Sequence, residues 1–371
     1  MQFEGTIVDA LSDAGAASNY WPPRDMALDH HGCFLCGRAL TAANRTDEHV
    51  FAKWMQNDFK LWDQQLFLPN QTGITYKQLT IPCCKECNGD WLARIEAQVS
   101  EAFRAGPDAV RDVDKTTLCL WMAKIYYGLH FKELALAADR RDPTSEAIVE
   151  PEYMSRLSQV HRVLQGLRGR ARFMRAPGSV HVFQAQVPAA PEQRFDYRDL
   201  AAVPFLALRV GPTVVVGSVL DWGAMNLVGD PYFAVADQLE LHPQQFREIA
   251  AHGAYFALRF DRRVSHLVVE AGGQDAIAPA IFDHIDSGEP RPLFRPFVPE
   301  EMAVVLASFT GLPLEDVYSA ETHGVWSTLL TKDGRPLTID LDAAAADVLL
   351  VPASWDARHR DDQRVMKLGE L

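Results

Sequence analysis

Two pairs of cysteines with the same internal spacing constrain this chain more than any other feature. Cys33 and Cys36 enclose two residues, and so do Cys84 and Cys87. Two such pairs suit one tetrahedral Zn²⁺, which thiolates bind at about 2.3 Å. The pairs therefore predict a structural zinc site that joins two distant segments. Cys83, which adjoins the second pair, is expected to be a spectator.

The segment between the cysteine pairs holds an acid beside an imidazole. Glu48 and His49 are adjacent in this segment, and Asn88 directly follows Cys87 of the second cysteine pair. A carboxylate and an amide supply oxygen donors, which Mg²⁺ prefers, and an imidazole titrates near neutral pH and can act as a general base. Neighbouring residues of a strand point to opposite faces, so Glu48 and His49 need a bend or bulge to serve one site.

From Gly32 to Glu96 this arrangement resembles the HNH endonucleases, the ββα-metal family. The resemblance implies a zinc-stapled module of two strands and a helix. It also implies a catalytic divalent ion, Mg²⁺ or Mn²⁺, that Glu48 and Asn88 bind. His49 would then activate a water for hydrolysis of a phosphodiester bond in DNA. A role in bacterial defence against foreign DNA would fit such an enzyme.

The chain departs from the family pattern in three ways. The residue that orients the histidine has no clear counterpart; Gln78 is nearest in register, and Asn70 is another candidate. The first metal-binding position holds Glu48, where Asp or His is commoner. The stretch from His49 to Cys84 is also longer than in compact members.

Plainer interpretations of the same residues remain open. The cysteines alone could form a zinc ribbon that binds nucleic acid or protein without catalysis. His49 could be a surface or capping histidine, and Asn88 could cap the helix that follows it. The same site residues would also serve an RNA-directed nuclease, because they do not distinguish ribose from deoxyribose.

Composition restricts the class of protein. A length of 371 residues predicts two or three domains. No apolar run is long enough to span a bilayer, and the first residues do not resemble a signal peptide. Closely paired cysteines indicate metal binding in a reducing compartment and not disulfides. We therefore expect a cytoplasmic protein without membrane partners.

The net charge of −13 argues against general nucleic-acid binding, which usually needs a basic surface. The charge is uneven, however. The stretch from Tyr153 to Ala190 holds no acid and several arginines. The predicted DNA contacts in this stretch are Arg168, Arg170 and Arg172, and we name these three residues the arginine strip. The alternative is that they belong to an ordinary solvated surface.

The order of the predicted elements indicates an α+β fold. We expect an HNH-like module in residues 1–110, an α+β domain in 111–290, and an extension or small subdomain in 291–371. The C-terminal domain would supply any homo-oligomer or protein-partner contact. Predicted strands are 46–51, 75–82 and a hairpin of 203–210 with 213–220; predicted helices are 52–68, one starting at Cys84, 114–138, 152–167 and 275–285.

Overall fold

The computed structural model describes residues 30–139, 141–142, 144–148, 154–228, 231–260, 265–271, 274–280, 292–321, 323–331, 333–342 and 351–353. These residues form two compact units, and each unit draws on separated stretches of the chain. The first unit takes its described residues from Met1–Glu101, Thr116–Pro177 and His266–Pro279. The second takes them from Ala102–Lys115, Gly178–Ser265 and Ala280–Leu371.

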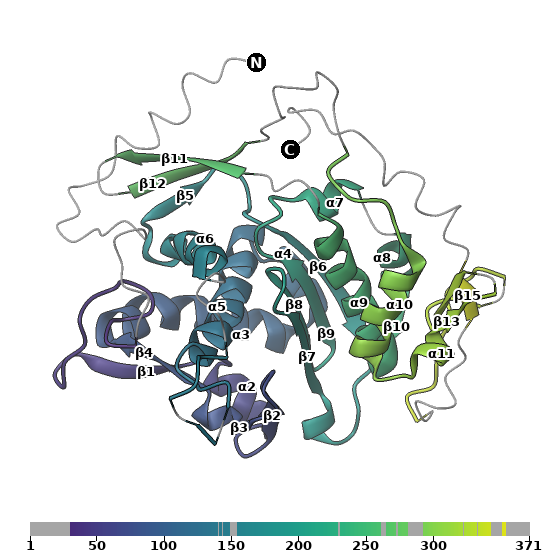
Figure 1. Ribbon diagram of the computed structural model, residues 1–371, viewed down its shortest axis with the longest axis horizontal. Helices are drawn as coiled ribbons and strands as arrows, with labels where there is room; N and C mark the ends of the chain where they lie inside the picture. The colour runs from purple at the N-terminus through teal and green to yellow at the C-terminus, as the bar shows by residue number, and fades with distance from the viewer. Residues whose placement is uncertain are drawn as a thin grey trace. The chain divides into compact units, whose positions relative to one another are not determined.

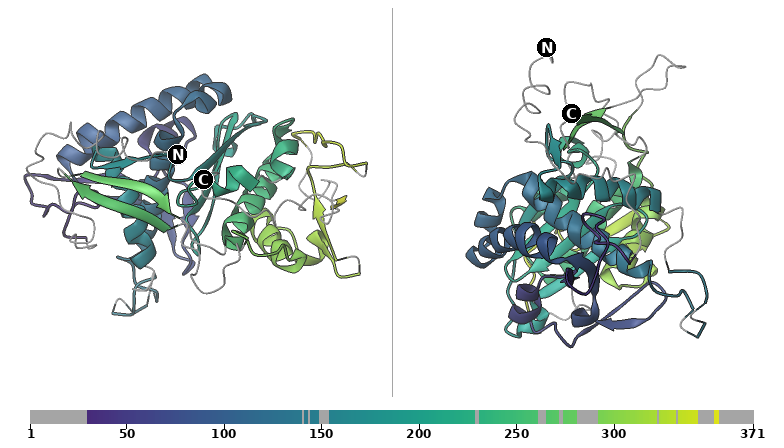
Figure 2. Two further views of the ribbon diagram at one scale, coloured as in Figure 1. Left: turned by 90° about the horizontal axis from the view of Figure 1, so that it is seen from above. Right: turned by 90° about the vertical axis from the view of Figure 1, so that its left-hand side faces the viewer.

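The first unit combines short strands with helices, of which α3 and α5 are the longest (Figure 1). Its strands are β1 (Arg45–His49), β2 (Gln65–Phe67), β3 (Gly73–Thr75), β4 (Thr80–Cys84), β5 (Ala171–Phe173), β11 (Ser265–Ala271) and β12 (Gln274–Ala280). Its helices are α2 (Lys53–Asp58), η2 (Tyr76–Gln78), η3 (Cys87–Leu92), α3 (Ala93–Ala105), α5 (Lys115–Glu133), α6 (Met154–Leu164) and η5 (Gln165–Arg168). Strands β11 and β12 lie side by side in Figure 1 and in the left view of Figure 2, and they form one sheet with β5.

Helix α5 forms the centre of the first unit. Every residue from Leu118 to Phe131 is buried, as expected for a helix that is apolar on all sides. Gly128 allows this helix to approach the β1–β4 sheet closely. A Cβ at Gly128 would lie 3.0 Å from Val50 Cγ2 and 3.4 Å from Ile81 Cδ1. This close packing places α5 next to the end of β1.

The second unit is built on an antiparallel sheet. Its strands are β6 (Ser179–Ala185), β7 (Phe195–Leu200), β8 (Phe205–Val210), β9 (Thr213–Ser218), β10 (Glu240–Leu241), β13 (Tyr318–Ser319), β14 (Gly324–Ser327) and β15 (Val351–Ala353). Its helices are α4 (Pro107–Asp112), η6 (Pro191–Gln193), α7 (Ala224–Val228), α8 (Pro231–Ala236), α9 (Pro243–Arg259), α10 (Pro299–Thr310) and α11 (Leu314–Val317).

The five-stranded sheet of the second unit has the order β10-β6-β9-β8-β7, in which only the β10–β6 pair is parallel. Helix α9 packs on β8 and β9, and α10 packs on α9 (Figure 1). Their apolar side chains form one buried core with the inward residues of the sheet. The predicted α+β class is therefore confirmed.

Several predicted elements are confirmed. The 203–210 and 213–220 hairpin appears as β8 and β9, joined through Gly211 at a φ of 60°, where glycine avoids the usual steric cost. Helices α5 and α6 occupy the predicted 114–138 and 152–167 ranges, with shorter ends.

Three predicted elements are wrong in extent or kind. The 52–68 helix stops at Asp58, because Lys60 takes a left-handed φ of 52° and the chain then turns into β2. The 75–82 strand is interrupted by η2, where Thr75 and Gln78 form a capping box. The predicted 275–285 helix begins as strand β12, in which burial alternates between neighbours. Residues 281–285 of that prediction lie outside the described residues.

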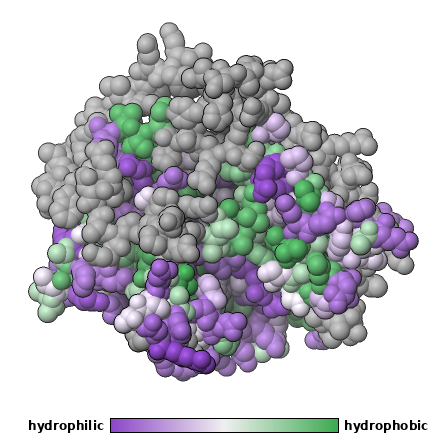
Figure 3. Space-filling model, in the orientation of Figure 1, coloured by the Kyte–Doolittle hydropathy of each residue, from purple (hydrophilic) through white to green (hydrophobic). Residues whose placement is uncertain are grey.

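The coloured part of the face in Figure 3 is mostly hydrophilic, with separate hydrophobic patches between the polar residues. This surface agrees with a chain that places its large apolar side chains in internal cores. None of the helices that the structure describes is both long and apolar enough to cross a membrane.

Candidate functional site

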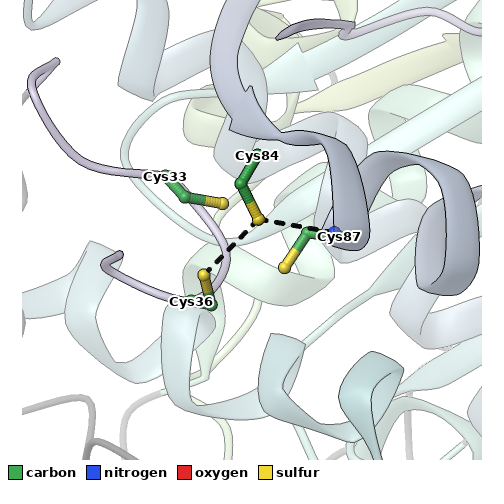
Figure 4. A group of neighbouring side chains, drawn as sticks. All are labelled: Cys33, Cys36, Cys84 and Cys87. Carbon is green, nitrogen blue, oxygen red and sulfur yellow. Dashed lines mark hydrogen bonds between the residues drawn. The ribbon is translucent and has the colours of Figure 1, made fainter. Parts of the chain in front are cut away.

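Four buried cysteines meet at one point of the first unit. The sulfur atoms of Cys33, Cys36, Cys84 and Cys87 all lie within 4.8 Å of one another, and their side chains turn toward a common centre (Figure 4). The Cys36 and Cys84 Sγ atoms are 3.8 Å apart. A tetrahedral Zn²⁺ with bonds of about 2.3 Å needs sulfur separations of about 3.8 Å. This buried group could therefore hold a metal ion such as zinc.

The backbone around the first cysteine pair is fixed by hydrogen bonds. A tight turn forms where Gly37 N donates to the Cys33 carbonyl at 2.8 Å. Two side chains from α6 and η5 hold the residues between the cysteines. His161 Nε2 lies 2.8 Å from the Phe34 carbonyl, and Gln165 Nε2 donates to the Leu35 carbonyl at 2.9 Å. The loop thus keeps its shape through contacts outside the cysteine group.

A cavity of about 270 Å³ opens at the end of β1, within the first unit. Its lining comes from β1, α2, η3 and α3, and includes Glu48, His49 and Asn88. The three candidate catalytic residues therefore line one space. They arrive from distant stretches because β1 pairs with β4, and the helix that follows β4 carries Asn88.

Glu48 and His49 are the last two residues of β1. Glu48 is opposite Ile81 and His49 is opposite Thr80 in the antiparallel register. The strand ends at His49, and the chain bends at the next two residues. The bend thus lies after both residues, and Glu48 and His49 both belong to the lining of the cavity.

Glu48 is not an open carboxylate, because a buried lysine pairs with it. Lys124 Nζ, on α5, lies 2.6 Å from Glu48 Oε1 and 3.1 Å from Glu96 Oε1. It also donates to the carbonyls of His49 and Val50, at 2.7 and 3.1 Å. The Lys124 ammonium thus connects the carboxylates of Glu48 and Glu96 with the backbone of His49.

Burial and the neighbouring charges shift the pKa values of Glu96 and Lys124. Burial raises the pKa of Glu96, and the charge of Glu48 adds to this rise, while Lys124 opposes it. Burial disfavours the charged ammonium of Lys124, but Glu48 and Glu96 outweigh that effect and raise its pKa. Trp54 Nε1 completes the group by donating to Glu96 Oε2 at 3.1 Å.

His49 is half-buried and has an aromatic neighbour. Its ring stacks on Trp62 with the centroids 5.7 Å apart. Burial lowers its pKa, the charges of Lys53 and Lys124 lower it further, and Asp47 partly opposes them. The imidazole is therefore neutral at neutral pH, which is the form that can accept a proton.

The remaining candidates occupy different surroundings. Asn88 Nδ2 donates to the Asp47 carbonyl at 3.3 Å, an arrangement that keeps Oδ1 as the acceptor of that amide. Gln78 is not among the residues that line the cavity; its Oε1 accepts from Thr75 Oγ1 at 2.8 Å. Asn70 Nδ2 donates to the Ala137 carbonyl at 3.1 Å.

The arginine strip runs from η5 through β5. Arg168 Nη1 donates to Gln165 Oε1 at 3.0 Å, Arg170 is half-buried and Arg172 is exposed. Helix η5 packs against η3, which carries Asn88. A distant acid reduces the positive charge of this region, since Asp275 of β12 pairs with Arg162 at 2.8 Å.

Lys124 and Glu96 are functional candidates that sequence reasoning missed. The available signal was a single lysine in the run Trp121-Met122-Ala123-Lys124-Ile125-Tyr126, where every neighbour is apolar or aromatic. A lysine in such a run is buried with its helix and therefore needs an acidic partner. Glu96 lies four residues after the buried Leu92, but its neighbours include Arg94 and Gln98, so the sequence around it gives no such signal.

Comparisons with known proteins identify no relative. A scan of the chain against protein-family models finds no match, and searches of curated proteins and of solved structures find none either.

Proposed function

We propose that the first unit is a metal-dependent endonuclease that hydrolyses phosphodiester bonds in DNA. The observation that carries this proposal is the shared cavity of Glu48, His49 and Asn88 beside a four-cysteine group. The order of β1, β4 and the following helix also agrees with the strand–strand–helix module of the HNH family, which the sequence resembles.

His49 is the general base in this proposal. Its pKa is lowered by burial and by Lys53 and Lys124, so its ring is neutral and ready to take a proton from a water. Stacking on Trp62 restricts the plane of the ring. Lys124 fixes the backbone of the same residue through the His49 carbonyl. The orientation of His49 is therefore assigned to Trp62 and Lys124 in place of Gln78.

The donor atoms of the cavity fit a hard divalent ion. Glu48 supplies a carboxylate, Asn88 an amide oxygen, and Asp47 a further carboxylate at the same wall. Mg²⁺ or Mn²⁺ would be held by Glu48 and Asn88, and would supply positive charge to the phosphoryl oxygens and the leaving oxygen. The four cysteines would hold Zn²⁺ with a structural role, joining the loop before β1 to the start of η3.

Cleavage of supercoiled plasmid in the presence of Mg²⁺ or Mn²⁺ tests the proposal. The wild type should nick the plasmid, and His49→Ala should lose at least about a hundredfold in rate, the usual contribution of a general base. His323→Ala is a matched control, since its side chain is 72% exposed in the second unit. Equal cleavage by wild type and His49→Ala would remove His49 from the mechanism. Parallel digestion of RNA decides between the two nucleic acids.

The ion pair of Glu48 with Lys124 favours a second candidate, a zinc-containing binding module without hydrolysis. A carboxylate that already neutralises a buried ammonium is a weaker ligand for another cation. This candidate predicts bound zinc, no cleavage of any nucleic acid, and no effect of Mg²⁺ on the unfolding temperature. The cleavage experiment and a thermal melt with Mg²⁺ separate the two candidates.

A further inference from the structure

Three arginines of the second unit meet around a single acid. Arg247 Nε, on α9, lies 2.9 Å from Asp196 Oδ2, and Arg198 Nη2 lies 3.5 Å from the same oxygen. Arg209 is directly opposite Asp196 in the β7–β8 register. We name Arg198, Arg209 and Arg247 the arginine triad. Three guanidinium charges against one carboxylate leave a surplus of two positive charges.

Arg209 is the buried member of the triad. Its residue is 3% exposed, and it lies on the face of β8 that carries Phe205 and Ala207 toward the core under α9. Its Nη2 donates to the Gln193 carbonyl. Within the part of the chain that the structure describes, its Nε and Nη1 have no hydrogen-bond partner, and neither does Nε of Arg198.

This arrangement is costly for the protein alone. Burial lowers the pKa of Arg209 to about 10; Asp196 opposes the change and Arg247 adds to it. Arg209 shares the single carboxylate of Asp196 with two other guanidinium groups, and two of its three nitrogens lack acceptors, which is unfavourable for a buried charge. Most buried polar groups in proteins have a partner, so three unmatched donor nitrogens in one cluster require an explanation.

The triad has an opening to solvent. Strand β7 is an edge strand of its sheet, and the side chains of Arg198 and Arg247 are 30% and 35% exposed. A small anion can therefore approach the partly exposed guanidinium groups of Arg198 and Arg247 from solvent, while Arg209 adds its charge from the buried side. Guanidinium groups bind phosphate through paired N–H donors, and a phosphate monoester carries a charge of about −1.5 to −2 near neutral pH.

We propose that the arginine triad of the second unit is a binding site for the phosphate group of a small phosphorylated ligand. Its surplus of two charges matches one phosphate monoester, and the partly exposed guanidinium groups of Arg198 and Arg247 supply the donors. The proposal does not depend on nuclease activity in the first unit. It gives the second unit the role of binding a ligand at a separate site.

Calorimetric titration of the full chain tests the site with inorganic phosphate and pyrophosphate at a constant ionic strength set by KCl. The wild type should bind phosphate saturably. Arg198→Gln and Arg247→Gln, which alter the partly exposed members, should each weaken binding about tenfold or more, as expected for a charged hydrogen bond. Arg335→Gln is the matched control, since Arg335 is an exposed arginine that also pairs with an aspartate; its affinity should equal that of wild type.

A fourth variant distinguishes a ligand site from an ordinary ion-pair cluster. Asp196→Asn removes the acid that the triad surrounds, so phosphate should bind more tightly than to wild type. The proposal is overturned if phosphate and pyrophosphate do not bind saturably to the wild type. It is also overturned if the Arg198 and Arg247 variants bind as wild type does, or if Arg335→Gln weakens binding equally.

Discussion

Lys124 and Glu48 form a buried ion pair at the wall of the cavity, with Nζ and Oε1 2.6 Å apart. The lysine is 1% exposed and the glutamate 7%. The same ammonium binds the carbonyl of His49. One side chain of α5 therefore positions both neighbouring residues of the proposed site, and the stability of the fold is connected with the geometry of that site.

Lys124→Met should destabilise the protein strongly. The substitution keeps the apolar stem but leaves Glu48 and Glu96 buried without their cation, which costs roughly 3–5 kcal/mol for a broken buried pair. Denaturant unfolding of wild type and variant measures the destabilisation. The double variant Lys124→Met with Glu48→Gln should recover part of it, because a neutral amide then replaces an unpaired charge.

Lys115→Met is the control for this experiment, since Lys115 is an exposed residue of the same helix. It should change the free energy of unfolding by less than about 0.5 kcal/mol. A Lys124→Met protein as stable as this control would mean that the ion pair contributes nothing to the fold.

The four-cysteine group should bind about one zinc per chain. Cys87→Ser should lose most of that metal, because a structural zinc needs all four ligands. Removal of the metal by a strong chelator should lower the unfolding temperature, since metal binding and folding are coupled. Elemental analysis and thermal melts measure the two effects.

Cys83→Ala and Cys119→Ala are the controls for the zinc experiment. Both cysteines are buried, but neither belongs to the group of four. Both variants should keep a full zinc content. Cys83 Sγ lies 3.9 Å from Cys33 Sγ, so its role as a spectator needs this test. Loss of zinc from Cys83→Ala alone would show that Cys83 is a zinc ligand.

The local features of the site were readable from the sequence, and the long-range ones were not. The spacing of Cys33, Cys36, Cys84 and Cys87 predicted a cluster because tetrahedral binding requires it. Apolar residues at helical spacing predicted the helix α5 with a broad buried face, and the structure buries this helix on all sides. In contrast, the partner of Lys124 depends on which turn of α5 faces β1, and this follows from the packing at Gly128.

The same limit applies to domain organisation. Predicted boundaries at residues 110 and 290 assume that a domain is continuous in sequence. The compact units instead take strands β11 and β12 into the first unit and α4 into the second. The pairing of β12 with β5 brings Asp275 to Arg162. No local pattern could predict this ion pair, because the two residues lie in separate segments of the chain.

The arginine strip should contribute to DNA binding. Replacement of Arg168, Arg170 and Arg172 by Ala should weaken binding and flatten its dependence on salt. The logarithmic slope should fall by up to roughly 0.9 for each DNA phosphate that the variant no longer neutralises. Binding isotherms at several KCl concentrations measure the slope.

The control for the strip removes the same charge elsewhere. Arg104, Arg295 and Arg335 are exposed and lie outside the strip, so their replacement by Ala tests the effect of net charge alone. This control triple should lower the affinity less than the strip triple. Identical binding by wild type and the strip variant would reject the strip as a phosphate-binding surface.

His161 should make stability depend on pH. Burial lowers its pKa from 6.5 to about 4, partly opposed by hydrogen bonding to the Phe34 carbonyl. Because the unfolded chain takes up the proton first, the contribution is complete above pH 6.5 and disappears as the pH falls toward 4. The free energy of unfolding should fall by about 2 kcal/mol from this group between pH 7 and pH 5.

His161→Gln is the control variant, because it keeps an N–H donor for the Phe34 carbonyl but cannot titrate. Denaturant unfolding at several pH values should show a smaller decrease in its free energy of unfolding between pH 7 and pH 5 than in wild type. An equal decrease in both proteins would exclude His161 as the titrating group, and any release of zinc in acid affects both alike.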